Sequence, residues 1–286
     1  MTNRAVLSPA NLLADNTLFF SVLAGVDVLG GSFNDLTDPQ LSSILTAAAA
    51  DPVQHRVGFT IDLLPPWTNQ PMLFGLLGVS GAAASAVGTD AGTILFETYI
   101  GAAQVSSESV FPFVFSDSGF LRSFWFFMPS GLGINRVDLV LSSPDNLPWS
   151  IGGLYAGRAL DIEIAQGWSM SIIDPGSMGR SISHQGYPRP AQHRRDLSAT
   201  FAPLSFAEAF GDGTPGSVDL QSIIMGMGTT GIGAFFPQTA DPATGVPDKI
   251  RRHRMGTYGH FTQIPVIHEL PGDLWEFGPF TWSELL

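Results

Sequence analysis

Apolar and polar residues alternate along much of this chain, with the period of two that is typical of half-buried β-strands. In residues 55–64 the apolar side chains Val57, Phe59, Ile61 and Leu63 occupy every second position. The same alternation predicts strands at 134–141, 160–164, 168–172 and 197–201, and a further strand is predicted at 93–100. The continuous apolar run 72–79 predicts a strand that is buried on both faces. The strand predicted at 120–128 is apolar on both faces, so we expect it to lie between two layers.

Helical signals are few and short. Asp38 and Pro39 are suited to the N-cap and first position of a helix, and an alanine run supports a helix over 38–50. Ser205 and Glu208 match the capping box that begins a helix, and Ser217 is suited to capping a second one. We therefore predict a mainly β chain. Residues 1–158 would form an antiparallel β-sandwich, and residues 159–286 a β-rich domain with two short helices.

Composition points to a folded protein with an apolar surface. Of the 286 residues, 44% are hydrophobic and 13% are charged, and there are 21 Phe and 6 Trp, which argues against disorder. This hydrophobic and aromatic content exceeds what a lone soluble monomer needs, so we expect some apolar surface to face other subunits. The alternative is a single large, well-packed core.

The net charge is −12, with one lysine, Lys249, against twelve arginines. An acidic balance argues against general nucleic-acid binding, which requires neutralisation of phosphates. Arginine without lysine suits bidentate contacts between proteins, although a compositional bias of the genome would give the same result. The chain has no cysteine, and so neither disulfides nor a thiolate metal site. Residues 1–15 do not resemble a signal peptide, and the stretch 78–96 is interrupted by Asp90, so we expect a soluble protein made in the cytoplasm.

Two groups of arginines stand out against this acidic background. The first lies in a turn-rich segment, 176–196, between two predicted strands, and the second lies near residue 252. Their members are Arg180, Arg189, Arg194, Arg195, Arg251, Arg252 and Arg254. Arginine forks pair with carboxylates and can fix the register between subunits. We predict that 176–196 is a loop acting as an interface arm, the alternative being a solvated loop that serves solubility.

Catalytic and metal-binding patterns are weak. Asp161 and Glu163 lie two apart on one predicted strand and could act as acid and base, but exposed polar positions explain them better. His253, His260 and His268 match no compact metal-ligand spacing. The sequence therefore predicts no catalytic residue, no metal site, no cofactor and no enzyme activity.

Three tryptophans are candidates for stacking on a sugar. They are Trp67, Trp125 and Trp149, all within the predicted sandwich. Aromatic rings serve as platforms for carbohydrate, and the alternative for each is burial in the core.

A series of short motifs runs from residue 151 to residue 209. In order, they are Ile151–Gly157, Gly167–Trp168, Asp174–Pro175, Arg180–Tyr187, His193–Arg195 and Ser205–Ala209. In this order the sequence resembles a family of virion proteins of tailed bacteriophages, best over about 134–210. The resemblance implies a galactose-binding-like jelly roll in the first half and a minor component of the tail tip, baseplate or neck.

The resemblance and the composition together predict a structural protein of the virion tail, synthesised in the host cytoplasm. It would assemble with other tail or baseplate proteins, in a multi-copy ring or complex. The alternative is a carbohydrate-binding module that recognises a glycan on the host surface. A glycan hydrolase is a third class, but the sequence lacks a strong acidic constellation for it.

Overall fold

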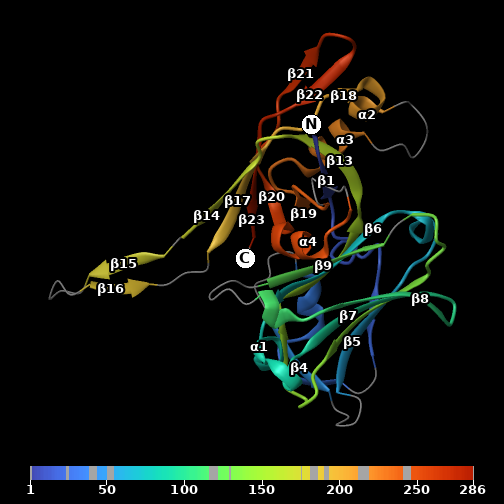
Figure 1. Ribbon diagram of the computed structural model, residues 1–286, viewed down its shortest axis with the longest axis vertical. Coiled ribbons are helices and arrows are strands. Elements are labelled where there is room, and N and C mark those ends of the chain that lie inside the picture. The colour runs from blue at the N-terminus through green and yellow to red at the C-terminus, as the bar shows by residue number, and fades with distance from the viewer. Residues whose placement is uncertain are drawn as a thin grey trace. The chain divides into compact units, whose positions relative to one another are not determined.

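The computed structural model describes residues 2–23, 26–38, 44–49, 55–115, 122–128, 130–174, 176–180, 186–189, 193–211, 219–240 and 246–285. The chain forms two compact units. Asn11–Ala159 is called here the inserted unit, and Met1–Ala10 together with Leu160–Leu286 the discontinuous unit. Both consist mainly of antiparallel strands (Figure 1), which confirms the predicted fold class, a β-sandwich followed by a second β-rich part.

The first ten residues belong with the C-terminal half of the chain. Strand β1 (Thr2–Ser8) pairs with β13 (Leu160–Ala165) on one side and with β19 (Gly233–Phe236) on the other. Its residues Ala5 and Leu7 are fully buried in the core of the discontinuous unit. The predicted boundary between 158 and 159 lies beside the observed one. The pairing of residues 2–8 with the C-terminal half was not predicted, because the short apolar run at residues 5–7 neither alternates nor identifies a partner strand.

The inserted unit contains three antiparallel sheets. Its elements are β2 (Phe20–Val22), β3 (Val26–Gly30), η1 (Phe33–Thr37), β4 (Leu45–Ala49), β5 (Arg56–Asp62), η2 (Trp67–Asn69), β6 (Met72–Val79), α1 (Ala82–Ser85), η3 (Gly88–Asp90), β7 (Thr93–Ile100), β8 (Ala103–Val110), η4 (Pro112–Phe115), β9 (Arg122–Met128), β10 (Arg136–Ser142), β11 (Trp149–Ile151) and β12 (Gly153–Arg158). The sheet orders are β2-β5-β10-β7-β8, β12-β6-β9 and β11-β4-β3.

The core of the inserted unit lies between the five-stranded sheet and the β12-β6-β9 sheet. Phe96 of β7 stacks on Phe126 of β9 at 4.9 Å between ring centroids, and it lies 5.6 Å from the ring of Phe74 on β6. On the other face of β9, Trp125 is fully buried and packs edge-on against Tyr155 at 5.5 Å. Both faces of β9 are therefore buried, as predicted from its sequence.

The prediction of a helix over 38–50 is wrong for residues 45–49, which the structure describes. Residues 45–49 form β4, which pairs with β3 and β11. Leu45 and Ala47 are fully buried in the core of the inserted unit. Alanine favours helices only by tenths of a kcal/mol per residue, and burial between two strands outweighs that preference.

The discontinuous unit is built on a seven-stranded antiparallel sheet. Its further elements are β14 (Ser169–Ile173), β15 (Ser177–Arg180), β16 (Gly186–Arg189), β17 (Arg194–Ala199), β18 (Leu204–Ser205), α2 (Phe206–Phe210), α3 (Leu220–Met227), α4 (Lys249–Met255), β20 (Thr257–Gln263), β21 (Ile267–Leu270), β22 (Leu274–Phe277) and β23 (Phe280–Glu284). The order in the large sheet is β13-β1-β19-β20-β23-β17-β14. A smaller sheet has the order β18-β22-β21, and β15 and β16 form a sheet of two.

The large sheet curls around an aromatic core. Just after β17, Phe201 forms an antiparallel bridge with Ile164 of β13, the strand at the other end of the sheet order. Inside the curl, the ring of Phe280 lies 4.6 Å from Phe201 and 5.4 Å from both Phe235 and Phe261. Aromatic contacts of this kind add about 0.5–1.5 kcal/mol each to the burial of apolar area.

Three short helices lie in the described part of the discontinuous unit, where two were predicted. The capping box at α2 is confirmed, because Ser205 and Glu208 each accept a hydrogen bond from the other's backbone N–H. Helix α3 begins after Asp219, whose side chain accepts a bond from the N–H of Ser222. The predicted cap, Ser217, lies outside the described residues. Helix α4 was not predicted, because arginine gives no apolar periodicity.

Candidate functional site

A long hairpin of the discontinuous unit is the strongest candidate for a functional site. Strand β14 pairs with β17 from Ser169 opposite Ser198 to Ile173 opposite Arg194, and beyond this β15 pairs with β16. Figure 1 shows β15 and β16 continuing the line of β14 and β17 past the rest of the unit. Residues 169–199 are called here the arm, and residues 176–193 the arm tip. An isolated two-stranded hairpin is only marginally stable in water, so packing against another chain would stabilise the arm tip.

The edge of the arm is apolar and open. Strand β14 is the last strand in the order of the large sheet. Its side chains Met170 and Ile172 are 40% and 64% exposed. The alternation of this segment predicted a half-buried strand, and its exposure was not foreseen. Exposed apolar edge strands are templates for pairing with another chain unless charge or a covering element protects them.

The prediction of a basic loop over 176–196 is wrong for most of the residues that the structure describes there, and 181–185 and 190–192 lie outside the described residues. Ser177–Arg180 form β15, Gly186–Arg189 form β16, and β17 begins at Arg194, because paired strands satisfy backbone groups that a loop would leave to water. Arg180 and Arg189 each end a strand of the arm tip, and their side chains lie outside what the structure describes. Arg194 at the base is exposed and lies 3.7 Å from Asp196.

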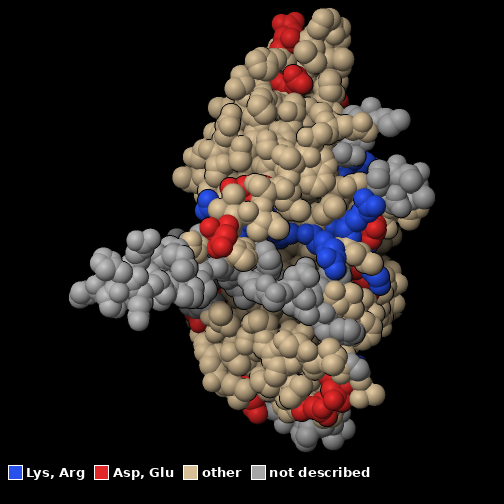
Figure 2. Space-filling view, turned by 60° about the vertical axis from the view of Figure 1, so that its left-hand side comes forward, with Lys and Arg blue, Asp and Glu red and all other residues tan. Residues whose placement is uncertain are grey.

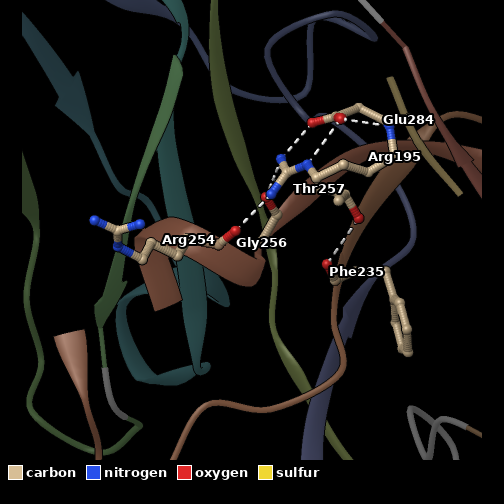
Figure 3. A network of polar contacts seen from close by, with 6 residues as sticks. All are labelled: Arg195, Phe235, Arg254, Gly256, Thr257 and Glu284. Atoms are coloured by element: carbon tan, nitrogen blue, oxygen red, sulfur yellow. Dashed lines mark hydrogen bonds and ion pairs between the residues drawn. The ribbon is translucent and has the colours of Figure 1, made fainter. Parts of the chain in front are cut away.

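Arg195 has an internal structural role (Figure 3). Its guanidinium pairs with the carboxylate of Glu284 on β23 through Nε and Nη2, with the Nε contact at 2.8 Å. It also donates to the carbonyl oxygens of Arg254 at 2.5 Å and Gly256 at 3.0 Å, at the C-terminal end of α4. The two side chains of the ion pair are only 16% and 8% exposed. Arg195 thus joins the base of the arm to β23 and α4.

The second arginine group lies on helix α4. Asp248 caps this helix, and its carboxylate accepts a hydrogen bond from Nε of Arg251 at 3.1 Å. Arg252 is partly buried, and Arg254 is exposed in the last turn, where the helix dipole favours positive charge. Arg195 brings the two predicted groups together through its bonds to the end of α4. Glu284, which completes this contact, was missed because nothing in the sequence pairs a C-terminal strand with β17.

Two of the three proposed sugar platforms are core residues. Trp125 and Trp149 are 0% and 1% exposed, so neither ring has a face open to a sugar. The alternative given for each residue, burial in the core, therefore holds for Trp125 and Trp149. Trp67 is partly buried in η2 and is the remaining candidate of the three.

Asp161 and Glu163 lie on β13 beside a groove of about 440 Å³. Arg4 of β1 is directly opposite Glu163 in the strand register, and its Nη2 lies 3.4 Å from the carboxylate of Asp161. Glu208 also lines the groove. Hydrogen bonds from the hydroxyl and the backbone N–H of Ser205 lower the pKa of Glu208, so its carboxylate is held ionised. The groove therefore carries three carboxylates and one guanidinium.

Within the described residues no group of three His, Asp or Glu side chains is arranged to hold a metal ion. None of the helices there has the length and hydrophobicity required to cross a membrane.

A polar row crosses the outer face of the five-stranded sheet in the inserted unit. The guanidinium of Arg136 lies 3.9 Å above the ring of Tyr99 and 3.3 Å from the carboxylate of Asp138. Asp138 accepts a hydrogen bond from Thr60 at 2.8 Å. Burial raises the pKa of Asp138, and the neighbouring carboxylates of Glu97 and Asp62 act in the same direction. Thr60 and Arg136 lower it by smaller amounts.

This raised pKa predicts a dependence of stability on pH. The folded chain binds the Asp138 proton more tightly than the unfolded chain, so this carboxyl makes the protein less stable as pH rises above about 3.9, its value in an unfolded chain. Urea unfolding of wild type and Asp138→Asn from pH 3 to pH 7 measures the effect. The unfolding free energy of the variant minus that of wild type should increase with pH. A constant or decreasing difference would contradict the assignment.

Comparison with known proteins gives no family for this chain. No family model matches the sequence. No curated protein matches it. One solved structure, "Structure of PfGH50B", aligns with 50% of this chain and 22% of its own, at 11% sequence identity and a TM-score of 0.31. A TM-score this low does not indicate a shared fold, so the function is inferred from the chain's own residues.

Proposed function

We propose that this protein is a structural component of the tail of a tailed bacteriophage, at the tail tip, baseplate or neck. It acts by assembly with other copies or other tail proteins, and not by catalysis. The arm is the observation that carries the proposal, because it extends past the core of the discontinuous unit and ends in a two-stranded hairpin. The order of short motifs from Ile151 to Ala209 supports a tail protein in particular.

The surface agrees with a role in assembly. Wide areas of the face in Figure 2 carry neither Lys or Arg nor Asp or Glu. Met170 and Ile172 of β14 are exposed on the arm, and Ile264 and Val266 are 40% and 52% exposed just before β21. Exposed apolar side chains such as these four are suited to contact with other proteins.

Immunogold imaging of phage particles tests the proposal. Antibodies raised against the purified chain are applied to intact particles of the phage that encodes it. Labelling should be confined to one position on the tail, and it should be lost in particles made without the gene. Label on the capsid alone, or normal particles free of the protein, would refute a role in the tail.

A further inference from the structure

The groove beside β13 has the form of a receiving site for an extended segment. The ladder between β13 and the chain after β17 covers only part of this strand, through bonds from Ala165 N–H to Thr200 O and from Ala202 N–H to Glu163 O. Pro203 follows, and since proline has no N–H it cannot extend the ladder. Among the described residues, none pairs with residues 160–162 of β13 on this side, and the groove lies beside them, lined also by side chains of α2 and α3. A strand placed there would continue the sheet, which is a common way of binding a peptide.

The charge and polarity of the groove define what would fit it. Asp161, Glu163 and Glu208 outnumber the single Arg4, so the groove has a net negative charge. Its other lining side chains include Leu204, Leu220 and Ile223, which are apolar. Its volume lies within the range of about 300–1,000 Å³ that is typical of binding clefts. An extended segment that carries an arginine together with an apolar or aromatic side chain would match the negative charge and the apolar lining of the groove.

The arm tip has this composition. Residues 176–193 contain two arginines, two histidines and no Asp or Glu, on a chain whose net charge is −12. Tyr187 and Arg189 lie two positions apart in β16, and tyrosine and arginine are the residue types that most often anchor interfaces. Arginine pairs with carboxylates in a bidentate way.

We propose that the groove of one copy receives the arm tip of a second copy of this chain. A chain cannot fill its own groove, because β15 and β16 lie far from β13, α2 and α3 within the discontinuous unit (Figure 1). Arm and groove are different surfaces, so the contact is head-to-tail and repeats into a ring or a filament. The inference rests on the proposed role in assembly, to which it adds a partner and a docking surface.

Cross-linking tests the contact in a chain that has no natural cysteine. One copy carries Ser177→Cys in the arm tip, and a second copy with a larger tag carries Pro203→Cys at the groove. A short bismaleimide should join them into a mixed dimer. Ala103→Cys, on the exposed strand β8 of the inserted unit, replaces Pro203→Cys in the control pair and should not cross-link. Failure of the first pair in a chain that associates, or equal yields from both pairs, would overturn the proposal.

Charge reversal provides an independent test. Asp161→Lys with Glu163→Lys should weaken association by about tenfold or more, Arg189→Glu should do the same, and a mixture of the two variants should associate like wild type. Association is measured by light scattering over a range of concentrations. If wild type associates and neither variant weakens it, the groove is wrong and the role in assembly stands. If wild type stays monomeric at every concentration, self-association fails, and the proposed tail function then depends on the particle labelling alone.

Discussion

Replacing Arg195 by alanine is expected to lower the free energy of unfolding by about 3–5 kcal/mol. The substitution removes the fork that pairs with Glu284 and the donors to the carbonyl oxygens of Arg254 and Gly256. Glu284 is only 8% exposed, so its carboxylate would be left buried without its cation. The cost comes mainly from that unpaired charge and less from the loss of an attraction.

Chemical unfolding followed by tryptophan fluorescence measures the effect, because Trp282 lies in the same strand as Glu284. Arg194→Ala is the matched control. It removes the neighbouring arginine, which is exposed and 3.7 Å from Asp196, and should cost no more than about 1 kcal/mol. Arg195→Lys should lie between the two, since an ammonium keeps the charge but not the fork. Equal losses for Arg194→Ala and Arg195→Ala would show that the network contributes little.

Much of the strand structure could be predicted because burial of one face dictates the sequence directly. The strand predicted at 93–100 and the strand predicted from the apolar run at 72–79 coincide with β7 and β6. The double-sided burial of β9 followed from its aromatic residues for the same reason. Local signals also located α2, since the capping box requires two particular side chains three positions apart.

Pairing between distant segments could not be predicted in the same way. No strand was predicted at residues 2–8, where residues 5–7 form a short apolar run without alternation, and such a run contains no information on whether the partner is β2 or β13. The alanines of β4 were misassigned because their helical preference is small and the burial that overrides it comes from β3 and β11. Both errors arise from contacts between residues far apart in sequence.

The candidate site shows the same limit. The sequence singled out the arginines of 176–196 as unusual in an acidic chain, but their roles differ. Arg195 is bound to Glu284 inside the discontinuous unit, whereas Arg194 is exposed one position away. Neighbouring residues of a strand lie on opposite faces, but the sequence of the strand does not show which face is covered by other parts of the chain. The groove beside β13 was equally hidden, because it is formed by segments that meet only in the folded chain.

Removing the arm tip is expected to abolish self-association while leaving the fold intact. Ile173 and Arg194 are direct partners at the end of the β14–β17 ladder, so residues 174–193 can be replaced by Asn-Gly, the preferred two-residue turn of a hairpin. None of the described residues in 174–193 belongs to the buried core of the discontinuous unit. The shortened chain should therefore unfold with a free energy within about 1 kcal/mol of that of the full chain, because the substitution touches no core contact.

Association should respond very differently, because the arm tip is both the proposed insert for the groove and the part of the hairpin that lacks a core of its own. Light scattering should show a monomer at concentrations at least about a hundredfold above those at which the full chain associates. The matched control replaces Tyr187 and Arg189 by serine in the full-length arm, which keeps its length and removes its proposed anchors. If both chains lose association, the side chains of the tip carry the contact. If the shortened chain alone loses it, the backbone pairing of the hairpin is responsible, and if neither loses it, the arm is not the assembly surface.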